Sequence, residues 1–427
     1  MGVKEINVEV SLKLTSHLPA SDPNLRENVA NELKGKLLHQ NSLIRAFDND
    51  FLAEHVLAIR ICELVVEESD SDNRQVEIML DDASKINIFM FRLSEETPQS
   101  EAIGGDDDTL AANFLPLPAR CLEGLWETLV YDSTIKHQLL QYSKAMLRYS
   151  KCGVDPNIIN CNRVLLLHGP PGTGKTSLSR AIAQKLSIRL NSSYAHALLI
   201  EINTHCLFSK YFSESGKLVS KMFGKIRELA EDPKVLLCVL IDEVESLTHS
   251  RSASSHGSEP SDAIRVVNAV LTHLDLLKTY PNVLTLSTSN ITNAIDLAFV
   301  DRADLCVLIP NPSAFGVYSI LYSCIEELVK AGIIQGPCPP RIENHRVFGT
   351  EIETNGCNRT FVDFCRNCVG MSGRSLRKLP LRVHTSILQP EEIVSFEEFV
   401  KALALAAELV KKEKQTFNSS GSGDVPS

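Results

Sequence analysis

The chain has 427 residues, and a typical size of roughly 150 residues per domain predicts two or three domains. It carries 43 Lys and Arg against 53 Asp and Glu, and the net charge of -10 argues against a chain-wide electrostatic grip on nucleic acid. No run approaches the roughly 18 apolar residues that a membrane span needs, and the N-terminus has no secretory apolar stretch. We therefore expect a soluble intracellular protein that binds neither nucleic acid nor membranes directly.

The 12 cysteines are expected to be reduced in such a protein, and most of them lie in apolar runs as small hydrophobic side chains. Cys365 and Cys368 form a Cys-x-x-Cys pair. Because no second such pair or paired His cluster completes a zinc site, packing is also the interpretation we favour for these two thiols.

The first 93 residues predict a small α+β domain. Period-two alternation predicts a strand over Ile6–Leu14, and Asp22 followed by Pro23 is typical of a helix start. Leucines and a valine at every fourth position extend this helix to about Gln40. Further runs predict strands over residues 55–66, 76–80 and 85–93. Since no catalytic constellation appears here, binding is the role we expect.

Residues 94–120 are acidic and rich in Gly and Pro, which predicts a linker or hinge. Strands then alternate with helices from residue 121 to 310, which indicates a second domain with a parallel sheet. Residues 311–414 are mainly helical, and residues 415–427 have the composition of a flexible tail.

The strongest motif is a phosphate-binding P-loop. An apolar strand, Arg163–His168, precedes it and a helical segment follows, which is the context that this motif requires. Its glycines let backbone N–H groups surround phosphate oxygens at a helix N-terminus. Lys175 would reach the β- and γ-phosphates, and the Thr176 hydroxyl would bind Mg²⁺. The loop comprises Gly169, Pro170, Pro171, Gly172, Thr173, Gly174, Lys175, Thr176 and Ser177.

Two carboxylates follow a continuous apolar run, Val235–Ile241, which predicts a central strand buried on both faces. Charged groups at the end of such a strand are costly unless they have a function. Together with the P-loop, they predict that Asp242 holds Mg²⁺ and that Glu243 orients or deprotonates the attacking water.

Two further polar residues are candidates in the same domain. The strand over residues 283–289 ends at Asn290, which would position the attacking water or contact the γ-phosphate, or would simply cap the next helix. Arg302 lies among acids, so it would either pair with Asp301 or Asp304 or act as an arginine finger on a neighbouring subunit's nucleotide.

Together these segments resemble an AAA+ ATPase module, through the runs GPPGTGKT, VLIDEVESL, RVVNAVLTHLD and STSN. Finer detail resembles the pachytene checkpoint AAA+ ATPase family, also called the thyroid receptor-interacting ATPases. The runs that carry this are GLWETLVYD, FSKYFSESGKLV, EPSDAIRVVNAVLT and GMSGRSLRKLP. The similarity extends from about Gly124 to Pro380, whereas the N-terminal domain resembles the family only in length and strand–helix pattern.

The resemblance implies an α/β fold in which an AAA+ P-loop module, with a parallel-sheet large domain and a small helical lid, follows the α+β domain. Family members are homohexamers that use ATP and Mg²⁺ to convert HORMA-domain proteins from closed to open forms. Their N-terminal domain docks a HORMA-like adaptor or the substrate itself. They act in the mitotic spindle checkpoint and on meiotic chromosome axes, which implies a nuclear and cytoplasmic location for this chain.

The resemblance also assigns substrate-contacting loops. Lys210, Tyr211 and Phe212 match the family's pore loop, where Tyr211 replaces the Trp that the family commonly carries. From the sequence alone these aromatics are equally compatible with a buried core. The stretch 250–260 matches a second pore loop, or is an ordinary surface connection.

The segment Gly370–Arg374 resembles the lid's nucleotide-sensing motif, so Arg374 would contact the γ-phosphate, with Arg377 as the alternative. A nucleotide-assembled interaction scaffold, or an unfoldase acting on a different protein, remains an alternative function. The acidic balance and the missing basic stripe disfavour a DNA-directed AAA+ ATPase.

Overall fold

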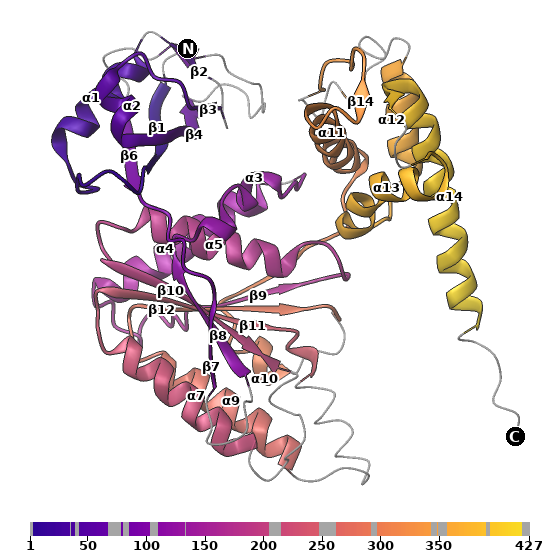
Figure 1. The fold of residues 1–427 in the computed structure, drawn as a ribbon. Coiled ribbons are helices and arrows are strands. Elements are labelled where there is room, and N and C mark those ends of the chain that lie inside the picture. The colour runs from indigo at the N-terminus through magenta and orange to yellow at the C-terminus, as the bar shows by residue number, and fades with distance from the viewer. Residues whose placement is uncertain are drawn as a thin grey trace, which may run out of the picture. The chain divides into compact units, whose positions relative to one another are not determined.

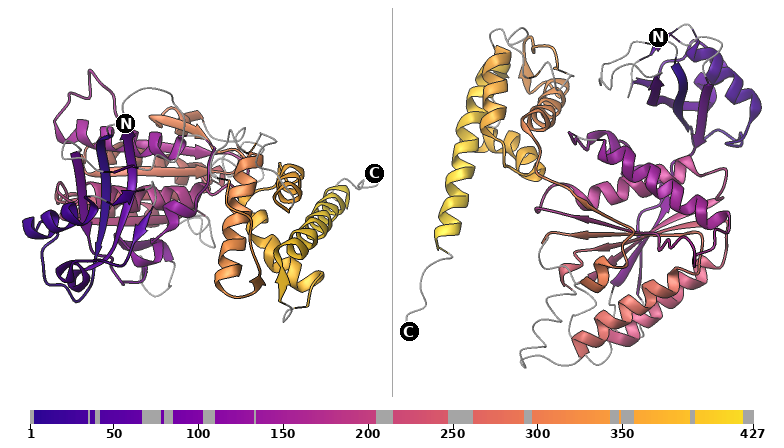
Figure 2. Two further views of the ribbon diagram at one scale, coloured as in Figure 1. Left: turned by 90° about the horizontal axis from the view of Figure 1, so that it is seen from above. Right: turned by 180° about the vertical axis from the view of Figure 1, so that it is seen from behind.

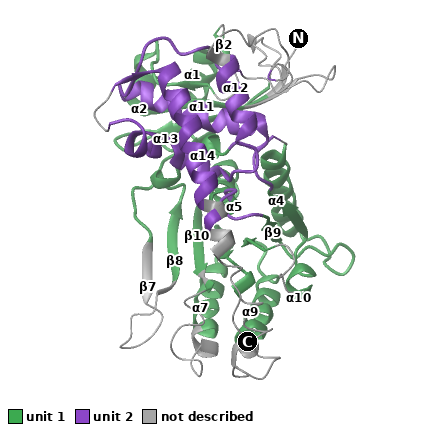
Figure 3. Ribbon diagram, turned by 90° about the vertical axis from the view of Figure 1, so that its right-hand side faces the viewer, with its two compact units in different colours: residues 1–129, 134–169, 175–309 green, residues 130–133, 170–174, 310–427 purple. Residues whose placement is uncertain are grey.

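The computed structural model describes residues 3–34, 36–38, 42–66, 78–79, 85–102, 110–132, 134–204, 215–246, 262–291, 297–342, 348, 357–389 and 393–420. The chain forms two compact units (Figure 3). One comprises residues 1–129, 134–169 and 175–309, and the other residues 130–133, 170–174 and 310–427. Among the described helices, none is long and apolar enough to cross a bilayer.

The N-terminal residues of the first unit form a four-stranded sheet in the order β3-β4-β1-β6. β4 is antiparallel and β6 parallel to β1. Apolar side chains on one face of β1 pack against α1 and form the core, with Ile6, Val8 and Val10 fully buried. The elements are β1 (Val3–Leu12), α1 (Pro23–Leu33), β2 (Leu37–Leu38), β3 (Leu43–Ile44), α2 (Asp50–His55), β4 (Val56–Val66), β5 (Ile78–Met79) and β6 (Lys85–Phe91).

Helix α1 begins where the sequence predicts but ends earlier. The Asp22 carboxylate accepts a hydrogen bond from the Leu25 N–H at 3.0 Å, and Pro23 occupies the first turn. The predicted extension to Gln40 is wrong, because Lys34 adopts an extended backbone and strand β2 follows. In the sequence Gly35 comes next, and glycine is a poor helix former, so the apolar spacing alone overestimates the helix length.

The segment expected to be a linker contains two strands, β7 (Gln99–Ala102) and β8 (Leu110–Leu117). β8 pairs antiparallel with both β7 and β10 of the large sheet. Ala112, Phe114 and Leu117 are buried there. The prediction of a linker is therefore wrong for β7 and β8. The composition of residues 94–120 is acidic as a whole, although β8 itself is a short apolar run.

The large sheet has seven strands in the order β13-β9-β12-β11-β10-β8-β7, and its first five strands are parallel. α4 and α5 lie on one face and α7 and α9 on the other (Figures 1 and 2). The five parallel strands confirm the predicted fold of the large domain, and β7 and β8 extend its sheet to residues before the predicted start at 121. Its elements are η1 (Arg120–Leu122), α3 (Leu125–Thr128), α4 (Ile135–Lys151), β9 (Val164–His168), α5 (Lys175–Arg189), β10 (His196–Asn203), α7 (Ser215–Ala230), β11 (Val235–Asp242), α9 (Asp262–Leu277), β12 (Val283–Ser289), α10 (Leu297–Val300) and β13 (Leu305–Leu308).

The second unit is mainly helical, as predicted. Its elements are α11 (Ala314–Lys330), β14 (Ile334–Gln335), α12 (Cys357–Asn367), α13 (Gly373–Ser386), β15 (Val394–Ser395) and α14 (Phe396–Ser420). Its core includes Cys365 and Cys368, which are 0% and 1% exposed and pack as small apolar side chains. Burial raises the pKa of the Cys368 thiol to about 11. Helix α14 continues to residue 420, into the segment that composition assigns to the tail.

Candidate active site

Residues 169–174 form the loop between β9 and α5, and two of them must be glycine. Gly169 has φ 138°, and a Cβ there would lie 2.4 Å from the carbonyl oxygen of Ile309. Gly172 has φ 78°, and a Cβ there would lie 2.8 Å from the Ser372 hydroxyl. Positions 169 and 172 therefore have no room for a larger side chain, and Thr176 and Ser177 follow in the first turn of α5.

The Lys175 side chain lies in the curve of this loop. The residue is 4% exposed, and its ammonium donates a hydrogen bond to the Gly169 carbonyl at 2.8 Å. Burial, and then the charge of Lys175, lower the pKa of His168, which keeps that imidazole neutral at pH 7. A buried ammonium beside a helix N-terminus attracts an anion, so these residues fit the phosphate chain of a nucleotide.

The Asp242 carboxylate meets the Thr176 hydroxyl, which lies 2.9 Å from Oδ1 and 3.1 Å from Oδ2. Thr288 from the adjacent strand β12 donates a second hydroxyl hydrogen bond to Oδ1. In the described residues no three His, Cys, Asp or Glu side chains gather into a metal cluster. One carboxylate and one hydroxyl still fit Mg²⁺, because this ion binds few protein oxygens and completes its shell with water and phosphate.

Glu243 follows directly, in a backbone conformation that is rare outside glycine. Its φ is 58°, and its N–H donates to the Thr288 hydroxyl at 3.3 Å. The Asn290 side-chain amide lies 3.4 Å from Glu243 Oε1. The structure thus brings Thr176, Asp242, Glu243 and Asn290 together at the carboxyl edge of the sheet, and strained backbone of this kind concentrates at functional sites.

Arg302 has a partner that the sequence did not indicate. Its guanidinium forms a two-pronged ion pair with Asp275 of α9, with the shortest contact at 2.8 Å, and donates to the Ala298 carbonyl at 2.7 Å. Asp304, one of the two expected partners, instead accepts hydrogen bonds from the backbone N–H groups of Asn162 and Val164.

In the second unit, which includes residues 170–174, Arg374 lies next to the P-loop. Its N–H donates to the Gly172 carbonyl at 3.0 Å. The hydroxyl of Ser372 caps the first turn of α13 by accepting from the Ser375 N–H at 3.3 Å. The proposed pore-loop residues Lys210, Tyr211 and Phe212, and the stretch 250–260, lie outside the described residues.

Several polar residues around Asp242 carry no motif in the sequence. Thr204 donates to the Asp242 backbone carbonyl at 2.9 Å, and Arg180 of α5 forms an ion pair with Glu201 of β10 at 2.6 Å. Together with Asp242 and Glu243 they line a cavity of about 300 Å³. For Thr288, which bonds to Asp242, the sequence did carry a signal, because the run Ser287-Thr288-Ser289 places three buried hydroxyls at the carboxyl end of β12.

Two protein-family models match the chain. The model of the ATPase family associated with various cellular activities (AAA) matches residues 165–311. The model of the TRIP13-like AAA+ ATPase lid C-terminal domain matches residues 313–411.

Curated relatives match nearly the whole chain. The Pachytene checkpoint protein 2 homolog of Xenopus tropicalis is 43% identical over 425 residues, which is 97% of this chain and 95% of that protein. The Homo sapiens homolog is 44% identical over 423 residues, covering 96% of this chain and 94% of that protein. The solved structure of C. elegans PCH-2 matches with a TM-score of 0.77 at 34% identity, covering 96% of this chain and all of that one (100%).

Proposed function

Because the chain belongs to the pachytene checkpoint protein 2 family of AAA+ ATPases, and is therefore an ATP-hydrolysing enzyme, we propose that it uses ATP to open closed HORMA-domain proteins. The meeting of Thr176, Asp242, Glu243 and Asn290 at one sheet edge carries the chemical part of this proposal. Family membership supports the choice of substrate. Similarity along 96% of the chain includes the N-terminal domain, through which we propose that an adaptor or the substrate docks.

We propose the following roles in hydrolysis. Lys175 would hold the phosphate chain, and Thr176 with Asp242 would hold Mg²⁺. The bound nucleotide would supply the γ-phosphoryl group, and the metal would neutralise charge that develops on it. The Glu243 carboxylate would take a proton from the attacking water. The Asn290 amide, 3.4 Å from Glu243 Oε1, would keep that carboxylate aimed at the water.

We further propose that six copies form a ring. Arg302 of each subunit would then act as an arginine finger on its neighbour's nucleotide, which requires exchange of its present Asp275 partner for phosphate oxygen. Arg374, whose backbone N–H bonds to the Gly172 carbonyl, would contact the γ-phosphate with its guanidinium and so sense the nucleotide state. Tyr211 would grip an extended substrate segment and draw it through the pore of the ring.

A Glu243→Gln variant tests the chemical assignment. The variant keeps the shape and the Asn290 contact but lacks a base, so it should bind ATP, assemble like the wild type and lose turnover. ATP hydrolysis, nucleotide binding and assembly mass are measured on the same preparation. Glu228→Gln, an exposed position on α7, is the matched control and should leave all three unchanged. Near-normal hydrolysis by Glu243→Gln would show that another group is the base.

A further inference from the structure

Thr288 lies at the end of β12 and is 1% exposed. In the parallel register of β11 and β12, Ile241 lies opposite Ser287, so Asp242 and Thr288 follow as the next opposed positions. Opposed residues of neighbouring strands project to the same face of a sheet. The sheet therefore places the Thr288 hydroxyl beside the Asp242 carboxylate.

One residue makes three hydrogen bonds to the turn that carries both carboxylates. The Thr288 hydroxyl donates to Asp242 Oδ1 and accepts from the Glu243 N–H at 3.3 Å. Its backbone carbonyl accepts from the Val244 N–H at 3.0 Å. A hydroxyl has one donor and two acceptor sites, so a single Thr side chain can serve Asp242 and Glu243 together.

Neighbouring hydroxyls on the same strand have different partners. The Ser287 hydroxyl donates to the Leu165 backbone carbonyl at 2.8 Å, and the Ser289 hydroxyl to the Ile291 carbonyl at 3.2 Å. Both serine hydroxyls therefore donate to backbone carbonyls. Among these three residues, Thr288 is the one whose hydroxyl contacts the two acids.

We propose that Thr288 is a positioning residue for ATP hydrolysis. Its hydroxyl fixes the rotation of the Asp242 carboxylate, and the same oxygen, with the Thr288 carbonyl, holds the left-handed turn at Glu243. Without these bonds Glu243 would relax toward a right-handed conformation and its carboxylate would point elsewhere. The inference rests on the ATPase activity alone and does not depend on the HORMA substrate.

Loss of the Thr288 hydroxyl should affect turnover and leave metal-free nucleotide binding unchanged. Lys175 and the loop glycines hold the phosphates without Thr288, so nucleotide affinity in the absence of metal should not change. When the Thr176 hydroxyl turns toward Mg²⁺, Thr288 would remain as the hydrogen-bond donor to Asp242. Loss of a group that orients a metal ligand typically costs about 10- to 100-fold in metal affinity or activity.

Thr288→Val has nearly the same shape and lacks the hydroxyl, so it removes two of the three bonds. We expect its kcat to fall about 10- to 100-fold, and the Mg²⁺ concentration that half-saturates nucleotide binding to rise about 10-fold. The KM for ATP at saturating Mg²⁺ should stay within about threefold, since the phosphate contacts remain. Thr288→Ser keeps the hydroxyl and should recover most of the turnover.

Ser287→Ala is the matched control, because it removes an equally buried hydroxyl one residue away. It should retain wild-type kcat and Mg²⁺ dependence whatever its effect on thermal unfolding. If Thr288→Val does not fold, Thr288→Ala carries the same comparison. A kcat within twofold of wild type, a Thr288→Ser as impaired as Thr288→Val, or an equal loss in Ser287→Ala would each overturn the proposal.

Discussion

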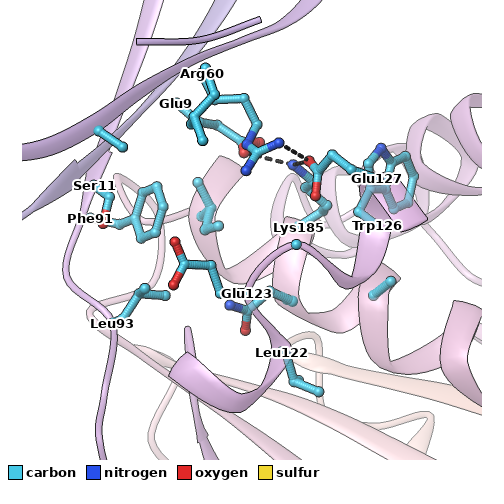
Figure 4. Close-up of a pocket in the computed structure, with 16 residues that line it drawn as sticks. Glu9, Ser11, Arg60, Phe91, Leu93, Leu122, Glu123, Trp126, Glu127 and Lys185 are labelled. Atoms are coloured by element: carbon cyan, nitrogen blue, oxygen red, sulfur yellow. Dashed lines mark hydrogen bonds and ion pairs between the residues drawn. The ribbon is translucent and has the colours of Figure 1, made fainter. Parts of the chain in front are cut away.

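A buried ion cluster joins the N-terminal sheet to helix α5, the helix that begins at the P-loop lysine. Glu9 of β1 contacts Lys185 at 2.6 Å and Arg189 at 3.0 Å, and the three side chains are 4%, 6% and 2% exposed. Figure 4 shows Glu9 and Lys185 meeting at one end of a pocket, with Glu127 on the other side of the ammonium. Glu9→Gln keeps the shape of the side chain and removes its charge.

This substitution leaves two buried cations without their shared carboxylate. Removing one partner of a buried ion pair generally lowers the free energy of unfolding by roughly 3–5 kcal/mol, because the remaining charge is desolvated and uncompensated. Lys185 keeps Glu127 as a partner at 3.1 Å, which favours the lower end of this energy range. We therefore expect the free energy of unfolding at pH 7 to fall by about 3 kcal/mol.

The loss should depend on pH in a defined direction. Burial raises the pKa of Glu9, but Lys185 and Arg189 together lower it by more, and the net pKa lies below its ordinary value of 4.5. The stabilisation is therefore complete above about pH 4.5 and disappears as pH falls through the pKa of the folded state. The difference between wild type and Glu9→Gln should shrink over that range.

Hydrogen exchange of the β1 amides, recorded at increasing urea concentrations, measures the loss of stability on the strand that carries Glu9. Glu413→Gln is the matched control, because Glu413 contacts Arg382 at 2.6 Å but the two side chains are 53% and 44% exposed. Exposed pairs contribute about 0–1 kcal/mol. A Glu9→Gln loss below about 0.5 kcal/mol, or a loss no larger than that of the control, would refute the assignment of a stabilising cluster.

Two further predictions concern the nucleotide site. Gly172→Ala should lower the nucleotide affinity, measured by fluorescence titration, more than 10-fold, because the added Cβ has no space. Gly153→Ala is the control, since Gly153 has φ 68° and no atom lies within 4 Å of its added Cβ. It should cost about 1 kcal/mol of stability and leave the nucleotide affinity unchanged. Arg302→Ala should reduce turnover about 10³-fold if it is a finger, whereas Asp275→Asn, which removes its partner within the chain, should stay within about tenfold. Mixing Arg302→Ala with Lys175→Ala subunits should restore part of the turnover, and no recovery at any ratio would contradict action between subunits.

The sequence predicted the parts of the site that are local in the chain. Gly172, Lys175 and Thr176 belong to one loop and helix start, and the Asp242–Glu243 pair ends a strand that is recognisable from its unbroken apolar run. Parallel strands then bring these ends to one edge, as the sheet order confirms.

What the sequence did not predict arises from contacts between distant segments. Glu9 alternates with apolar residues on β1 and so has the pattern of a solvent-facing acid, yet its partners lie 176 and 180 residues away on α5. Arg302, in the turn after α10, likewise pairs with Asp275, which lies 27 residues earlier on helix α9. Such pairings depend on how elements pack, and spacing within a single element carries no information about them.

We propose that this ATPase opens HORMA-domain proteins, and conversion of a closed HORMA protein by the purified chain is the first measurement to make. A conformation-sensitive fluorescent label on the HORMA protein, with its adaptor present, would report the change as ATP is added. We expect conversion to the open form that requires ATP and is abolished in Glu243→Gln. A preparation that hydrolyses ATP rapidly and leaves the closed form unchanged, or converts it equally without ATP, would contradict the account.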